Sequence, residues 1–427
     1  MFVDKQPPPP DQTEMTGYLG RLTPEQKVKL AELWEAMEEV MNREPVKADA
    51  PPAAQKKKGG MFGGLFGGQA AKKDVEWEIN ENGEKVFPGL DELLKGMNPK
   101  DLQRSFWDIT TQDYPDTILL RFLRARKWDV QAALRMMLAT QKFRMEEDVA
   151  GLIQQGDLGM EKHFKSTGEK GWRFQWESGK SFFLGTDKWN RPICYINVRL
   201  HFKKDQDDVP LRKFTLLVIE TARQLLVPPV ETSCLVFNMT GLSMANLDLG
   251  FLKYLIMCFE AYYPESLGLC IVHNAPWFFE PVWRVIRPWL DPVVASKIRF
   301  TNSTDDLLQY IPEKYLPKDV GGTSDFKWNY IPPVEGENDK HKDTATRDAL
   351  LAKRRELENQ FEERTREWVK AVKADDKDAA DAAWAKREEL NPQLRRAYYD
   401  LDPYVRGRNV YHRTGVLKPD FSVHWQA

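Results

Sequence analysis

The sequence is poor in cysteine and histidine. Cysteines form the disulfides of secreted domains, and both residue types bind many protein-bound metals. None of its four cysteines belongs to a CxxC pair, and each lies in an apolar stretch, so we expect buried, reduced thiols at Cys194, Cys234, Cys258 and Cys270. The six histidines show no ligand spacing. These shortages argue against a disulfide-stapled domain. A metal or haem protein is an alternative that an absorbance spectrum would test.

The chain also lacks a long apolar run and an excess of charge of either sign. Its longest apolar run, 249–259, is interrupted by Lys253 and falls short of the ~20 residues that span a bilayer. The opening MFVDKQPPPPDQ has no apolar core of a secretion signal. The formal net charge of −2 argues against a nucleic-acid partner. The composition therefore predicts a cytoplasmic protein.

An aromatic stretch interrupted by prolines stands out in this ordinary composition. It reads HNAPWFFEPVWRVIRPWLDPVVASKIRF from residue 273 and contains Trp277, Phe278, Phe279, Trp283 and Trp289, separated by Pro276, Pro281 and Pro288. Proline disrupts a helix interior, so a single long core helix is not expected here. Two interpretations are open: ordinary core side chains, or rigid pieces of a hinged lid.

Changes in composition divide the chain into five regions. These are 1–45, a Pro-rich tail and an amphipathic helix; 46–88, a flexible Lys/Gly-rich linker; 89–150, a helical lobe; 155–325, an α/β lobe; and 326–427, a helical extension. The first helix has a clear start, because Thr23 and Gln26 form a capping box around Pro24.

Two of these regions have alternative roles. In the linker, lysines flank Met61, Phe62, Leu65 and Phe66, which either contact an anionic membrane or lie in solvent. The C-terminal region predicts two amphipathic helices that fold back as a hairpin, the first along Phe361 and Trp368 and the second around Trp384. Its many charges are typical of a solvated face, and a protein partner is the second interpretation.

Between residues 155 and 325, strand-like and helix-like segments alternate. Short apolar runs occupy 191–198, 232–241, 267–274 and 297–302. The segments between them have helical spacing, as in LRKFTLLVIETARQLL and LDLGFLKYLIMCFEAYY. This alternation predicts an α/β layer with a largely parallel sheet.

Four stretches, in order and at matching spacing, resemble the CRAL-TRIO lipid-binding family. They are RFLRARKWDV (121–130), FNMTGLS (237–243), CFEAYYPESLG (258–268) and WLDPVVASKI (289–298). The resemblance covers roughly residues 95–325 and is to the branch of fungal phosphatidylinositol transfer proteins. It implies a helical lobe followed by an α/β lobe, whose largely parallel sheet floors an apolar pocket under a mobile helical gate.

On this resemblance, the aromatic stretch is the gate and its hinge. Phe278, Phe279, Trp283 and Trp289 would face a lipid when the gate is closed and a bilayer when it is open. The resemblance also implies that the protein is no enzyme and has no cofactor, with a bound phospholipid as cargo. It further implies transient, peripheral contact with intracellular membranes.

The family's inositol-phosphate site maps onto Arg126, Lys127, Glu265 and Lys297. Cations suit the phosphate, and a carboxylate accepts hydrogen bonds from inositol hydroxyls. We expect Ser233 and Tyr263 as further headgroup contacts. Each residue alone is equally typical of a solvated helix end, strand edge or turn, so the prediction depends on the set being complete.

The sequence departs from the family at two hydroxyl positions. Leu235 and Val294 stand where the resemblance would place threonines, the first of which belongs to a phosphatidylcholine headgroup site. We therefore expect weak phosphatidylcholine binding. A wholly apolar lipid such as squalene or a sterol, or a scaffold that presents lipid without transferring it, is the alternative.

A serine hydrolase is a further alternative. The stretch TGLSMA (240–245) follows an apolar strand, as a nucleophile elbow does, but Ala245 replaces the second glycine of G-x-S-x-G. No persuasive His–Asp pair follows it. Ser243 is better explained as a helix N-cap.

Overall fold

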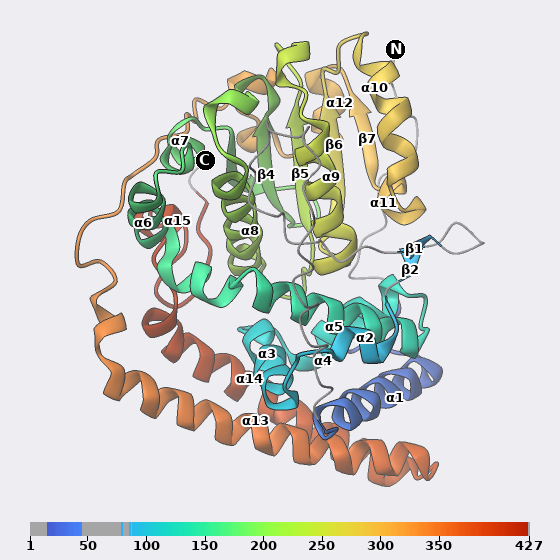
Figure 1. Ribbon diagram of the computed structural model, residues 1–427. Helices are drawn as coiled ribbons and strands as arrows, with labels where there is room; N and C mark the ends of the chain where they lie inside the picture. Colours follow the sequence, from blue (N-terminus) through green and yellow to red (C-terminus); the bar gives the residue numbers. More distant parts are fainter. Residues whose placement is uncertain (1–14, 45–77, 80–84, 87, 426–427) are drawn as a thin grey trace, which may run out of the picture.

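The computed structural model describes residues 15–44, 78–79, 85–86 and 88–425 of the 427-residue chain. The α/β lobe is built on a five-stranded sheet whose strands follow chain order (Figure 1): β3 (Ser181–Thr186), β4 (Pro192–Asn197), β5 (Ser233–Asn238), β6 (Leu267–His273) and β7 (Ile298–Thr301). The edge strand β3 is antiparallel to β4, and the other neighbours are parallel. The four expected strands are confirmed, whereas β3 was not predicted.

The connections between the parallel strands lie on one face of the sheet. Because such crossovers are right-handed, strands in chain order place every crossover on the same side. The first is α8 (Asp208–Leu225), the second is α9 (Leu249–Met257) with the π-helical turn η5 (Cys258–Tyr262), and the third is α10 (Phe279–Ile286), η6 (Arg287–Trp289) and α11 (Pro292–Ser296).

Side chains that alternate along the strands separate two apolar layers. On β5, Leu235 packs with the crossover helices, whereas Cys234 and Val236 pack on the opposite side. That opposite layer is covered by α12 (Thr304–Leu308) and the chain that follows it, where the Tyr195 hydroxyl donates to the Tyr315 carbonyl at 2.5 Å. The cysteines predicted to be buried thiols are all free and buried.

A helical lobe precedes the sheet, as expected, but its helices continue beyond the predicted end at residue 150. It comprises α2 (Leu90–Leu94), α3 (Pro99–Thr110), α4 (Pro115–Ala125), α5 (Val130–Glu146), α6 (Val149–Thr167) and α7 (Trp172–Glu177). The amphipathic helix α1 (Pro24–Met41) packs against this lobe, and its predicted capping box is present, with Gln26 N–H donating to Thr23 Oγ1 at 3.3 Å. A two-residue pairing joins β1 (Glu78–Ile79) to β2 (Lys85–Val86).

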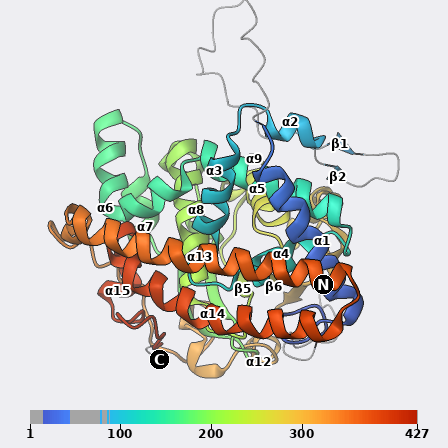
Figure 2. The same ribbon diagram turned by 90° about the horizontal axis from the view of Figure 1, so that it is seen from below.

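The C-terminal region forms the predicted hairpin of α13 (Thr344–Lys373) and α14 (Lys377–Val405), which runs along one side of the molecule beside α1 (Figure 2). One face of the hairpin is buried, because Phe361 packs against Trp34 and Trp107. The chain then returns to the sheet through α15 (Val410–Arg413), where the Tyr411 hydroxyl accepts from Phe183 N–H at 2.6 Å. The extension thus shares one apolar core with the helical lobe.

Two expectations lie outside the described residues: the Pro-rich tail, and the linker segment with its apolar residues around 61–66.

Candidate functional site

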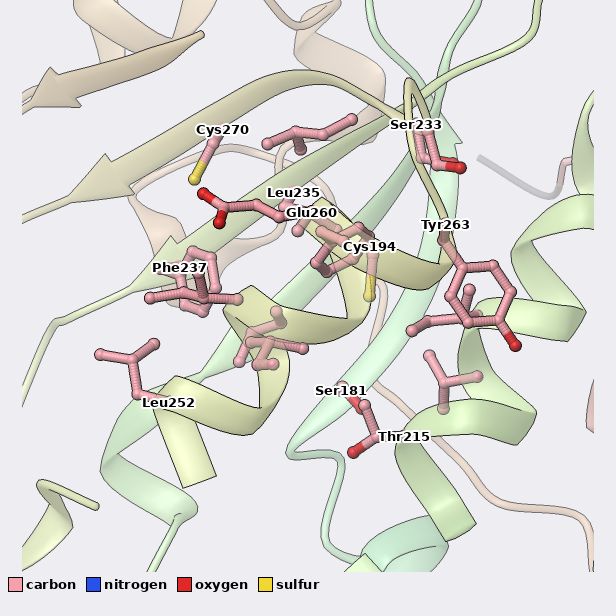
Figure 3. A pocket seen from close by; sticks show the side chains of 18 of the residues that line it. Ser181, Cys194, Thr215, Ser233, Leu235, Phe237, Leu252, Glu260, Tyr263 and Cys270 are labelled. Carbon is pink, nitrogen blue, oxygen red and sulfur yellow. The ribbon is translucent and has the colours of Figure 1, made fainter. Parts of the chain in front are cut away.

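A cavity of about 310 Å³ lies between the sheet and the crossover helices (Figure 3). Its wall is mainly aliphatic and aromatic and includes Leu235, Phe237 and Cys270 from the strands and Leu252 from α9. Along α8 the wall extends from Leu211 to Leu226, which is roughly 22 Å at 1.5 Å per residue. For comparison, one leaflet of a bilayer contributes roughly half of a ~30 Å hydrocarbon core. The cavity is therefore long enough for lipid chains.

Polar side chains gather where the cavity meets the helical lobe, which we call the lobe end. Ser233 begins β5 there, beside Tyr263 and Ser266 of the η5–β6 loop. From α4, the buried Arg121 reaches the same wall. Its two terminal nitrogens donate to the carbonyls of Glu265 and Glu231 at 3.0 and 2.7 Å. A guanidinium thus fixes the loop that carries Glu265.

Glu265 and Lys297, two of the predicted headgroup residues, lie together just outside this wall. Lys297 Nζ is 3.7 Å from Glu265 Oε2, and the two side chains are only 19% and 17% exposed. Burial lowers the pKa of Lys297; the carboxylate of Glu265 opposes that shift and the nearby Arg124 adds to it. An anionic group placed here would be held by an ammonium that has little access to water.

The backbone around this pair is strained in the way that functional sites often are. Glu265 has a φ of +54°. The pairing of β5 with β6 shifts after Ser233, which is opposite Leu267, so that Cys234 is opposite Leu269. The residue skipped is Gly268, where an added Cβ would lie 2.4 Å from Thr232 Oγ1. This bulge therefore requires glycine, and it follows directly after the loop that carries Glu265.

Arg126 and Lys127 are placed differently from Glu265 and Lys297. Arg126 is half-buried at the end of α4, and Lys127 follows it, exposed and with a φ of +51°. Like Glu265 and Lys297, neither residue belongs to the described cavity wall, which includes Arg121. Their role as phosphate contacts stays a prediction.

The cations that sequence reasoning missed are Arg121 and Arg124, five and two residues before Arg126 in the same motif. Arg124 Nη2 pairs with Glu231 Oε2 at 2.7 Å, and its guanidinium lies 3.9 Å from the centre of the Tyr18 ring. Only the three-dimensional position of Glu231, distant in sequence, identifies Arg124 as part of this cluster.

Tyr263 is already hydrogen-bonded within the protein. Its hydroxyl donates to Glu220 Oε1 at 2.8 Å and accepts from Arg144 Nη1 at 3.2 Å. Burial, followed by the charge of Glu220, raises its pKa well above the ordinary value. The ring lines the cavity, so an apolar contact with a ligand fits Tyr263 better than the predicted polar one. The Ser233 hydroxyl also lines the cavity and has no such partner among the described residues.

The predicted gate, residues 275–290, contributes two aromatic side chains to the cavity wall. These are Phe279, which is buried, and Trp283, whose ring meets Phe300 of β7 edge-on at 5.2 Å. Phe278 is half-buried beside Trp277, and 86% of Trp277 is exposed. The segment therefore presents one aromatic face to the cavity and one to solvent.

Two contacts hold the end of the gate. The ammonium of Lys253 on α9 lies 4.6 Å from the centre of the Trp289 ring. The N–H of Asp291 donates to Glu260 Oε1 at 2.6 Å, and Glu260 itself lines the cavity. Trp289 thus anchors the gate rather than lining the cavity, whose described wall does not include it.

The serine-hydrolase alternative finds little support in the geometry around Ser243. The Ser243 hydroxyl and its N–H both donate to Asn246 Oδ1, at 2.7 and 2.8 Å, in a capping box at the short 3₁₀ helix Met244–Asn246. No cluster of three His, Cys, Asp or Glu residues suited to a metal occurs in the part of the chain that the structure describes. Within that same part, no helix is long and apolar enough to cross a membrane.

Comparison with known proteins agrees with this architecture. The CRAL/TRIO domain profile matches residues 177–322, and the CRAL/TRIO N-terminal domain profile matches residues 89–139. A CRAL-TRIO domain-containing protein of Schizosaccharomyces pombe, C3H8.02, is 42% identical over 78% of this chain and 72% of its own length. The chain belongs to the CRAL-TRIO family.

Two further relatives carry more specific names. The phosphatidylinositol transfer protein CSR1 of Eremothecium gossypii is 36% identical over 95% of this chain and 99% of its own. The SEC14 cytosolic factor of the same organism is 31% identical over 50% of this chain and 71% of its own. The match to CSR1 therefore includes the terminal regions that flank the CRAL-TRIO lobes.

Proposed function

We propose that this protein binds phosphatidylinositol in the cavity and transfers it between membranes. The observation that carries the proposal is the Glu265–Lys297 pair at the lobe end of an apolar cavity. Such an arrangement suits a ligand with a phosphate and hydroxyls at one end and hydrocarbon at the other. The name of the CSR1 relative supports the same ligand.

Transfer requires that the cavity open at a membrane surface. A two-chain phospholipid has ~30 methylenes at ~0.8 kcal/mol each, so release into water would cost about 24 kcal/mol. The lipid must therefore pass directly between bilayer and cavity. The gate supplies a suitable element, because Phe279 and Trp283 face the cavity while Trp277 is already exposed.

The cellular setting follows from this function. We propose a cytoplasmic protein that contacts intracellular membranes transiently, carries its lipid unchanged rather than acting as an enzyme, and has no nucleic-acid partner. The exposed, charged face of the α13–α14 hairpin would be the surface available to a protein partner. The second candidate function is presentation of the lipid to an enzyme, which would use the same cavity.

A charge reversal tests the assigned headgroup site. Lys297→Glu places a carboxylate beside Glu265 and should abolish phosphatidylinositol transfer between vesicles while the thermal melt stays near that of the unmodified protein. Lys318→Glu is the matched control, because Lys318 is exposed and pairs only at the surface with Asp325. Undiminished transfer by Lys297→Glu would overturn the site.

The competing hypothesis is that the same cavity binds a wholly apolar lipid. Leu235 and Val294 make its wall less polar, which would suit squalene or a sterol. If the protein exchanges such a lipid but no phosphatidylinositol, the apolar-lipid hypothesis replaces phosphatidylinositol transfer.

A further inference from the structure

The cavity has a second polar region at its inner end, away from the helical lobe. Lys180 precedes β3, and the start of β3 is paired with Ile196 near the end of β4. Ser233 begins β5, which runs parallel to β4, so Lys180 and Ser233 lie at opposite ends of the sheet. The inner end of the wall contains Lys180, Ser181, His201, Thr215 and Asp248, which we call the inner polar cluster. Figure 3 labels Ser181 and Thr215 among the side chains that line the pocket.

Lys180 is only 5% exposed and its ammonium is incompletely satisfied by the protein. Nζ lies 3.3 Å from His201 Nδ1 and 3.4 Å from Gln206 Oε1, both long contacts. An ammonium has three N–H donors and no acceptor, so one donor has no partner among the described residues. A buried donor of this kind favours a ligand that brings an acceptor oxygen.

The charges around Lys180 indicate what kind of oxygen fits. The charges of Asp205 and Asp248 both act on the ammonium and partly offset the lowering of its pKa by burial, so two carboxylates already act on one cation. His201 is held neutral, since burial and then Lys180 lower its pKa. A ligand carboxylate would add a third negative charge to a site of low dielectric, whereas an uncharged oxygen would not.

A hydroxyl also matches the acceptors at this end. The Thr215 hydroxyl donates to the Leu211 carbonyl at 2.9 Å, so its oxygen can only accept from a ligand. Asp248 Oδ1 accepts from Phe251 N–H at 3.0 Å, and Oδ2 is 3.6 Å from His201 Nε2, too far for a direct hydrogen bond. A ligand hydroxyl both accepts and donates hydrogen bonds. It would therefore find a donor in the Lys180 ammonium and an acceptor in the Thr215 oxygen.

We propose that the inner polar cluster is a second subsite of the cavity, which takes the hydroxyl of an otherwise apolar, uncharged lipid alcohol. The hydroxyl oxygen accepts from Lys180 Nζ, and its proton is donated to the Thr215 or Ser181 oxygen. The hydrocarbon then extends along α8 towards the lobe end. This subsite depends on the proposed function only in that lipids enter the cavity, and it would make a lipid alcohol compete with phosphatidylinositol for one space.

The test compares three probes that differ at one end of the same chain. The full-length protein is equilibrated at pH 7 with vesicles that contain equal amounts of 1-hexadecanol, hexadecane and hexadecanoic acid, and the lipid it retains is quantified by mass spectrometry. We expect the protein to retain more hexadecanol than hexadecane or hexadecanoic acid, relative to their proportions in the vesicles. Equal retention of hexadecanol and hexadecane would overturn the subsite, and preference for hexadecanoic acid would overturn the uncharged ligand class.

Variants locate the effect. Lys180→Met should lower the hexadecanol-to-hexadecane ratio about tenfold, as expected for a lost hydrogen bond from a charged donor. Lys188→Met, the same change at an exposed lysine in the turn after β3, should not alter it. An unchanged ratio in Lys180→Met contradicts the proposal. Lys297→Glu separates the two proposals, because it should abolish phosphatidylinositol transfer and leave this ratio intact.

Discussion

At the scale of single residues, Leu235 and Val294 predict which headgroups the cavity accepts. Both line the cavity, Leu235 from the same strand as Ser233 and Val294 from α11, and both bring methyl groups rather than hydroxyls. A buried headgroup that loses a hydrogen-bond partner loses ~1–3 kcal/mol, or roughly ten- to a hundredfold in affinity. We therefore expect phosphatidylcholine transfer to be at least tenfold slower than phosphatidylinositol transfer. The double variant Leu235→Thr, Val294→Thr should reduce the difference between the two transfer rates. Equal rates of phosphatidylcholine and phosphatidylinositol transfer by the unmodified protein would contradict the expectation.

Lys180 predicts a pH dependence of stability. Burial lowers its pKa to about 8, from an unfolded value near 10.5, despite the opposing charges of Asp205 and Asp248. Between these values the unfolded chain binds more protons than the folded one, so this residue makes stability rise with pH. Below pH 8, Lys180→Met should be the more stable protein, by a difference on the order of 3 kcal/mol, and this advantage should shrink as pH approaches 10.5.

Urea unfolding of both proteins at pH 7 and pH 9.5 measures this difference. Other groups titrate in the same range, but they are common to both proteins and cancel in the subtraction. A constant difference between the two pH values would show that Lys180 does not carry a destabilising charge in the folded protein.

At the scale of elements, the gate should matter more for exchange than for stability. On the proposed gating, Trp283→Asp places a carboxylate on a surface that would open towards hydrocarbon, where a charge costs several kcal/mol. We expect lost phosphatidylinositol transfer with a melt within a few degrees of the unmodified protein. The comparison is Phe106→Asp, fully buried between α1 and α3, which should collapse the melt. A collapsed melt for Trp283→Asp would assign this residue to the core instead.

The elements themselves were mostly predictable, and the exceptions have physical reasons. The parallel strands were found because strands buried on both faces form continuous apolar runs, as in CIV and CLV. The edge strand β3 was missed because SFFLGT contains a glycine, which weakens the strand pattern. In the site, Glu265 and Lys297 meet as the resemblance implied, whereas Arg124 and the inner polar cluster depend on contacts between residues far apart in sequence.

At the scale of the whole molecule, the C-terminal hairpin is part of the helical lobe rather than a separate appendage. Arg387 of α14 is buried, and its Nη2 lies 2.6 Å from Asp116 Oδ1 at the start of α4. Trp34 of α1 donates to the same oxygen at 2.7 Å. The guanidinium also lies 4.8 Å and 4.5 Å from the centres of the Phe361 and Trp368 rings. One arginine thus joins four helices. This contact was not predictable, because charge patterning alone favoured a solvated face for the hairpin.

Removal of this arginine should destabilise the entire chain. Arg387→Ala leaves Asp116 buried without its cation, which typically costs 3–5 kcal/mol. Arg396→Ala is the control, because Arg396 pairs with Asp400 on the exposed face of the same helix, where such pairs contribute about 0.3–0.5 kcal/mol. Chemical unfolding of both variants gives the comparison. Similar losses in the two would contradict the integral role of the hairpin.

The central claim, that the cavity selects phosphatidylinositol, is tested most directly by the lipid that the protein retains. Purified full-length protein is equilibrated with vesicles containing equal amounts of phosphatidylinositol and phosphatidylcholine, re-isolated, and extracted for mass spectrometry. We predict about one lipid per protein, with phosphatidylinositol enriched at least tenfold over its share in the vesicles. Retention of both lipids in the vesicle proportion, or of neither, would contradict the claim.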